Sequence, residues 1–215
     1  MKKNLLLLTI VLISASAAKA QLDFSSLRVD AGANYTMYKG DFDQKTPGVK
    51  VRLSVPDNEK IAIGVGFTYG FPIKIASEMA FTGGSTVPSE FVYNFKTISL
   101  EFDYYFGGEK EEGLSVYGSG RMGLVLAGYK EKLKGTAPAG EEPMFEPSKG
   151  SESGFTINLA LGTQYALGER SKIFADAGIA LPANKVGDQY VENVIPSHFM
   201  FNLGVRFSLG AGSDN

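Results

Sequence analysis

The chain has 215 residues, with 21 Lys and Arg against 23 Asp and Glu, and it contains no Cys. This length suits one domain. The acidic balance argues against a nucleic-acid-binding protein, which usually carries a basic patch, and the lack of Cys excludes disulfide bonds. The chain is rich in Gly (26), Phe (15) and Tyr (10) and shows no helical periodicity, which indicates an all-β protein.

The first predicted element is a signal peptide over residues 1–20. Two lysines form a positive start, residues 5–13 form a short apolar run, and Ala18-Lys19-Ala20 forms a small-x-small cleavage site. An uncleaved anchor helix is the alternative, but it needs about 20 apolar residues. The mature domain is therefore predicted to be residues 21–215.

Eight segments of this domain alternate apolar with polar or small residues, which is the period of a β-strand. In chain order they are 27–38, 49–55, 61–71, 97–106, 114–126, 155–167, 173–181 and 198–209. Every second connection is short, and the others are long loops over 39–48, 72–96, 127–154 and 182–197. This rhythm predicts an eight-stranded antiparallel up-and-down β-barrel with both termini at its short-turn end.

The two faces of the predicted strands differ in charge. One parity carries no charged residue within the segments, whereas the other carries Arg28, Asp30, Lys50, Arg52, Glu101, Asp103, Arg121, Asp176 and Arg206. In a soluble barrel the apolar parity would fill the interior, but an eight-stranded interior is only just wide enough for side chains. Large residues such as Phe67, Phe102, Phe201 and Phe207 would overfill it. We therefore expect a transmembrane barrel whose apolar parity faces lipid.

The charged parity then lines a closed polar interior, where buried charges must be paired. We predict a structural charge cluster there, made of Asp30, Arg52, Glu101, Asp103, Arg121, Asp176 and Arg206. In it, Arg121 is expected to lie diagonally near Glu101 across the turn 107–113, within reach of a long side chain.

The leader, the eight strands, the alternation of short turns and long loops, and the Gly-rich fifth strand resemble the small outer-membrane β-barrel proteins. These are the OmpX/OmpA-transmembrane type and the outer-membrane β-barrel domain common in Bacteroidota. The resemblance covers the whole mature chain. It implies a bacterial outer-membrane location, a monomer, contact with lipid and lipopolysaccharide, and insertion by the barrel assembly machinery. The family usually ends near a terminal aromatic residue, whereas here Phe207 is followed by SLGAGSDN.

Two motifs could carry chemistry. "GSGRMG" at 118–123 fits G-x-G-x-x-G, but more strand follows it and no βαβ unit exists, so we interpret it as close packing of a strand. His198 is the only histidine. None of the possible catalytic partners of His198 is well placed. Ser197 points to the opposite face of the strand, Ser208 lies at the far end of the strand, and Asp176 is expected at a different depth in the barrel. The sequence therefore predicts no catalytic, cofactor-binding or metal site.

The predicted function is non-enzymatic, in membrane integrity or in surface contacts made by the loops. A surface ligand is expected at 72–96 and 127–154, because exposed loops on a rigid scaffold commonly carry function. The first loop is rich in apolar residues and is expected to extend the strands or to cap the barrel mouth, and the second is expected to be mobile. The alternatives are a lipid-modifying enzyme with a nucleophile near His198, or a soluble lipocalin-like periplasmic carrier.

Overall fold

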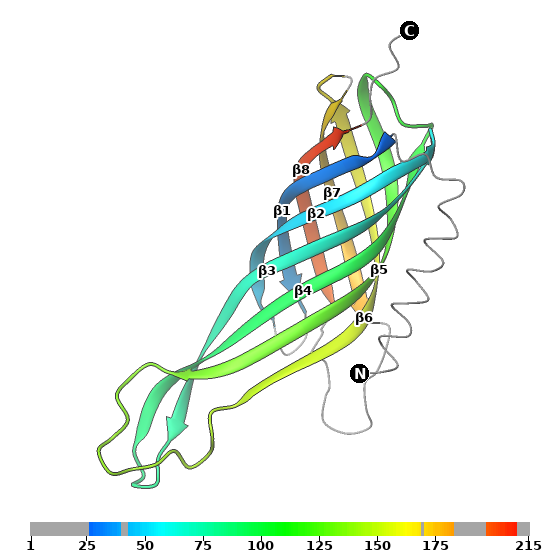
Figure 1. Ribbon diagram of the computed structural model, residues 1–215. Coiled ribbons are helices and arrows are strands. Elements are labelled where there is room, and N and C mark those ends of the chain that lie inside the picture. Colours follow the sequence, from blue (N-terminus) through cyan, green and yellow to red (C-terminus); the bar gives the residue numbers. More distant parts are fainter. Residues whose placement is uncertain (1–25, 40–42, 169, 183–196, 210–215) are drawn as a thin grey trace.

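The computed structural model describes residues 26–39, 43–168, 170–182 and 197–209, and the predicted signal peptide lies outside them. The described chain forms one closed antiparallel barrel in which each strand pairs with the next and β1 closes on β8 (Figure 1). The strands are β1 (Arg28–Tyr38), β2 (Lys45–Asn58), β3 (Ile61–Ala80), β4 (Thr86–Phe106), β5 (Gly113–Leu133), β6 (Lys149–Ala166), β7 (Ser171–Pro182) and β8 (His198–Ser208). The predicted fold is confirmed. Within the described residues, no helix is long and apolar enough to cross a membrane.

The apolar parity faces outward, as predicted. Large apolar side chains cover the outside of the barrel, and Leu203 and Leu161 leave 64% and 65% of their surface exposed. The opposite parity is buried inside, where Glu101 and Asp103 are at most 1% exposed. A water-soluble protein rarely exposes so continuous an apolar surface, whereas lipid is its natural solvent.

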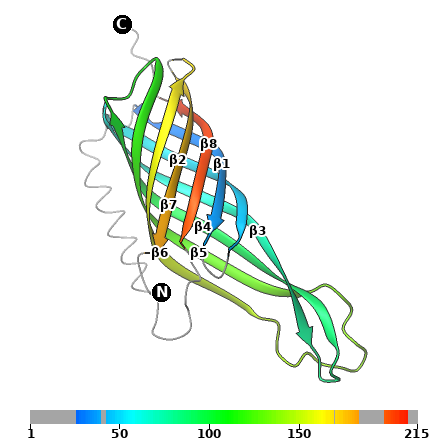
Figure 2. The ribbon, with the colours of Figure 1, turned by 180° about the vertical axis from the view of Figure 1, so that it is seen from behind.

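Several strands are longer than their apolar alternation predicts. β2 begins at Lys45, so residues 45–48 of the predicted loop 39–48 are strand. β3, β4, β5 and β6 continue past the end of the other strands and form a sheet that projects from one side of the barrel (Figures 1 and 2). Residues 72–80 and 86–96 of the predicted loop 72–96 are strand, so the prediction of a loop is wrong for them. Of the two expectations for this segment, the structure shows the strand extension and not a cap on the barrel mouth. In the predicted mobile loop 127–154, residues 127–133 and 149–154 are strand, so only 134–148 connects them.

The projection has its own small core. Met79, Phe81, Val87 and Leu133 pack together, and Phe81 is fully buried. The connection 134–148 folds back on the tip, where Pro143 forms an isolated bridge with Phe81. These contacts give the projection a buried apolar centre outside the barrel, which a free loop lacks.

The opposite end of the barrel carries the short turns. The described start of β1 and end of β8 also lie there, because the backbone N–H of Ser208 donates to the carbonyl of Arg170 in the turn between β6 and β7, and Arg28 pairs with Ser208. Gly107 and Gly108 in the turn between β4 and β5 have φ of 81° and 86°, and Gly113 at the start of β5 has φ of 77°. Side chains other than Gly adopt this left-handed region at a cost, so glycine suits a tight reversal here.

Candidate functional site

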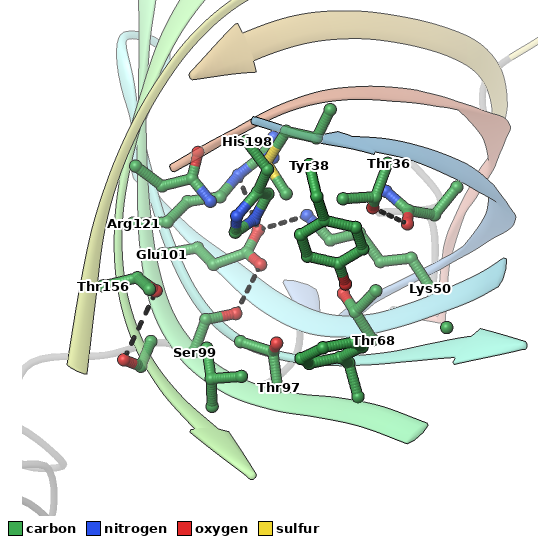
Figure 3. Close-up of a pocket in the computed structure, with 17 residues that line it drawn as sticks. Thr36, Tyr38, Lys50, Thr68, Thr97, Ser99, Glu101, Arg121, Thr156 and His198 are labelled. Atoms are coloured by element: carbon green, nitrogen blue, oxygen red, sulfur yellow. Dashed lines mark hydrogen bonds and ion pairs between the residues drawn. The ribbon is translucent and has the colours of Figure 1, made fainter. Parts of the chain in front are cut away.

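Glu101 on β4 is the centre of an ion-pair network in the lumen (Figure 3). Its Oε2 atom lies 2.8 Å from Nζ of Lys50 and 3.5 Å from Nε of both Arg52 and Arg121. Ser99 donates a hydrogen bond of 2.7 Å to the other carboxylate oxygen. One buried anion thus faces three cations that come from β2 and β5.

A second part of the network lies closer to the short-turn end. Arg206 on β8 binds Asp30 on β1 through two parallel hydrogen bonds of 2.7 Å, a bidentate geometry that gives strong and directional pairing. Arg206 also donates to Gln164 at 2.6 Å, and Arg52 binds Asp103 directly. These bonds join the neighbouring strands β8 and β1, and they also join strands that lie two apart in the barrel, β8 with β6 and β2 with β4.

Arg121 makes its shortest ion pair with Asp176 on β7, at 2.7 Å. Asn202 donates to the other oxygen of Asp176 at 2.6 Å, and Asn34 donates to Asn202 at 2.8 Å. Both oxygens of this buried carboxylate therefore have partners, as a buried charge requires.

Glycines on β3 leave room for the pairs between β2 and β4. A Cβ atom on Gly66 would lie 2.3 Å from Oε1 of Glu101, and one on Gly64 would lie 2.7 Å from Nε of Arg52. Because β3 lies between β2 and β4 in the sheet, side chains at these positions would occupy the path of the ion pairs. The glycines on the polar parity of β3 therefore leave space in the lumen for the charged side chains.

All seven residues of the predicted charge cluster face the lumen and take part in these pairs, and each is at most 6% exposed. The sequence reasoning left out Lys50, although it noted this residue on the polar parity. With Lys50 included, four cations (Lys50, Arg52, Arg121 and Arg206) face four anions (Asp30, Glu101, Asp103 and Asp176). Neutrality of a closed lumen is the signal that could have added it.

The short-turn end is closed by a residue that the sequence reasoning missed. Glu109, in the turn after β4, pairs with Arg28 at 2.6 Å and with Lys172 at 2.7 Å, and it accepts a hydrogen bond from Gln164. Burial acts to raise the pKa of this carboxyl, but Arg28 and Lys172 outweigh it, so the pKa lies below its usual range. Glu109 thus remains an anion that holds the turn against β1 and β7.

The other end of the lumen is closed by apolar side chains. Tyr38, Ile73, Phe95, Val125 and Ala127 form a buried cluster there. Between the two ends a cavity of about 30 Å³ remains, lined by residues that include Lys50, Glu101 and Arg121 (Figure 3). That volume holds a few water molecules at most. The geometry therefore suits neither a wide channel nor an organic ligand.

The two candidate motifs take structural positions. Gly118 and Gly123 lie within β5, so "GSGRMG" is strand, as interpreted, and no helix opens there. His198 is the first residue of β8 and points into the lumen, where the centroid of its ring lies 5.2 Å from the centroid of the Tyr38 ring. It pairs in register with Ala180, whereas Asp176 pairs with Asn202. Among the described residues, no group of His, Asp and Glu is arranged to hold a metal ion.

The chain matches, over residues 5–210, the family model described as outer membrane protein beta-barrel domain. A comparison with curated proteins found no match. Similar solved structures include a major outer membrane protein from Thermus thermophilus, which has 13% identity and a TM-score of 0.59 and covers 85% of this chain and 99% of its own. Neisserial surface protein A has 14% identity, a TM-score of 0.53 and coverage of 84% and 96%.

Ail, the attachment invasion locus protein of Yersinia pestis, has 11% identity, a TM-score of 0.50 and coverage of 85% and 98%. At such identities the likeness concerns the fold. Location follows from the family model together with the apolar exterior, and both contradict the alternative of a soluble periplasmic carrier. The chain belongs to the outer membrane protein beta-barrel domain family and is an outer-membrane protein.

Proposed function

We propose that the protein is a non-enzymatic barrel that anchors the projecting sheet of β3–β6 at the cell surface as an interaction platform. The observation that carries this proposal is the projection itself, a sheet with a separate apolar core and a connection folded onto its tip. The projection buries its own apolar core outside the barrel, which favours a role at the surface over membrane integrity alone. Both ends of the lumen are closed, which argues against transport.

This proposal includes a topology. Residues 1–20 act as a cleaved signal peptide, residues 21–215 form the barrel domain, and the barrel assembly machinery inserts it as a monomer. The short turns, the start of β1 and the end of β8 then lie in the periplasm, as is usual for barrels with an even number of strands. The projection faces outward, where lipopolysaccharide or a surface ligand contacts it.

Single-Cys labelling tests the topology, because the chain has no Cys of its own. Met144, 56% exposed on the tip connection, and Glu111, exposed in the turn after β4, are each replaced by Cys. A membrane-impermeant maleimide added to intact cells should label the Met144→Cys variant and spare the Glu111→Cys variant. Permeabilised cells provide the control, since both variants should react there. Labelling of only the turn in intact cells would reverse the topology.

A lipid-modifying enzyme would need His198 near a nucleophile at the lipid-facing rim. The ring instead faces the lumen and is largely buried. We therefore expect His198→Ala to leave the lipid A composition of the outer membrane unchanged, as judged by mass spectrometry. His198→Phe keeps an aromatic ring against Tyr38 and serves as a control for folding. A lipid A change that is lost in both variants would establish the enzymatic alternative.

A further inference from the structure

Three lysines lie in one cross-strand row on the projection. Lys74 on β3 pairs with Val92 on β4, Val92 pairs with Lys130 on β5, and Lys130 pairs with Lys149 on β6. Their three side chains are exposed on the face that continues the lipid-facing surface of the barrel. Lys130 and Lys149 are therefore direct neighbours on adjacent strands.

Like charges placed directly opposite each other destabilise a sheet. In the part of the chain that the structure describes, no carboxylate lies within ion-pair distance of any of these three ammonium groups. On the same face of the sheet, Glu90 lies two residues from the row on β4, opposite Ala76 and Lys132, and its carboxylate pairs with Lys134 at 2.9 Å. Glu90 also interacts electrostatically with Lys74 at longer range. The described residues therefore leave the neighbouring charges of Lys130 and Lys149 without an ion-pair partner.

The row lies just beyond the apolar belt. On β5 the belt ends at Leu126, and Lys130 follows four residues later, which is about 13 Å along a strand. With the usual tilt of a barrel strand, this is roughly 10 Å along the membrane normal. The head-group region extends about 5–7.5 Å beyond the hydrocarbon on each side of a bilayer. The backbone of the row therefore lies just outside this region, and the flexible four-carbon stems of the lysine side chains allow their ammonium groups to reach into it.

We propose that Lys74, Lys130 and Lys149 bind phosphate groups of the phosphorylated glycolipid in the outer leaflet. An anion between Lys130 and Lys149 removes their repulsion, and Lys74 reaches a second phosphate two strands away. A lipid fits better than free phosphate, because the row lies on an open outward face beside the belt and not in a pocket. The inference rests on the proposed topology, which places this face in the outer leaflet.

The test uses the full mature protein refolded into phosphatidylcholine vesicles that contain lipid A, with bound lipid A measured by native mass spectrometry. Lys130→Gln/Lys149→Gln is compared with Lys60→Gln/Lys110→Gln, which removes the same charge at exposed positions of the short-turn end. We expect the first variant to bind lipid A about tenfold more weakly or worse, and the second to bind like the wild type. Dephosphorylated lipid A should bind all three proteins equally weakly.

Lys149→Glu separates binding from folding. It places opposite charges on neighbouring strands, so the projection should resist protease at least as well as in the wild type, while lipid A binding falls as in the Gln variant. The proposal would be overturned by equal losses of lipid A binding in both double variants, by a wild-type protein that binds dephosphorylated lipid A as tightly as lipid A, or by displacement of lipid A by inorganic phosphate at millimolar concentration. This measurement in vesicles does not depend on orientation in the cell. The maleimide experiment can therefore fail on its own, and the two failures are distinguishable.

Discussion

Glu101→Gln is expected to lower the free energy of unfolding of the membrane-embedded barrel by about 3–5 kcal/mol, the cost of breaking a buried ion pair by removing one partner. The carboxylate faces Lys50 at 2.8 Å and two guanidinium groups at 3.5 Å. The amide keeps the shape of the side chain but removes the anion, so the closed lumen holds one uncompensated positive charge. Equilibrium urea unfolding of the refolded protein in lipid vesicles measures the change.

Two further variants make this result interpretable. Glu112→Gln removes the same charge from an exposed turn residue and should change stability by about 0.5 kcal/mol at most. Lys50→Met combined with Glu101→Gln removes one charge of each sign, and it should recover part of the loss because neutrality returns. If Glu101→Gln behaved like Glu112→Gln, the lumen would be solvated well enough that the network does not stabilise the barrel.

The barrel and its inside-out faces could be predicted from the sequence because lipid imposes a strict rule on every outward position. Each second residue between Ile61 and Phe71 or between Thr97 and Phe106 had to be apolar or aromatic, and this produced the alternation. The rule holds only within the membrane. The predicted strands therefore agree with the barrel part of β3–β6 and miss their extensions.

The end of the third predicted strand shows why. The register between β3 and β4 shifts between Gly70 and Ile73, so the parity of inward and outward residues changes there. Beyond this bulge the outward positions hold the charged residues Lys74 and Glu78, which lie outside the apolar belt, and Ile73 and Met79 are buried. Alternation with a changed phase and a polar outer face resembles a loop when read from the sequence alone.

The lumen was predictable by parity but not in its pairing. Glu101 and Arg121 were expected as diagonal neighbours, yet they lie directly opposite each other in register. Even so, the shortest ion pair of Arg121 is with Asp176 on β7. Such pairs depend on curvature and on the space above small residues, which parity does not describe. Glu109 was missed because it lies in a turn, where strand periodicity carries no information.

The outward face gives the last prediction. Leu100 lies on β4 between Glu101 and Ser99, with its side chain on the outer surface near the middle of the belt, opposite Met122. Leu100→Lys places an ammonium group against acyl chains and should cost about 2–4 kcal/mol of unfolding free energy. Leu100→Ile keeps an aliphatic side chain of equal volume in a strand and should change stability by less than about 1.5 kcal/mol. The same urea titration in vesicles measures both.

A lipid-quenchable probe shows whether the cost arises from contact with lipid. Single Cys residues are introduced in turn at Leu100, Glu101, Phe102 and Asp103 and labelled, which the Cys-free chain allows without further changes. Lipids that carry a quencher on the acyl chain should quench the label at the two outward positions and spare it at the two lumenal ones, since Asp103 is fully buried. A label at a lumenal position can disturb folding. Heat-dependent gel mobility must therefore first show that each labelled variant forms a closed barrel. Quenching at 101 and 103 in folded protein would place the charges in lipid and would contradict the inside-out barrel.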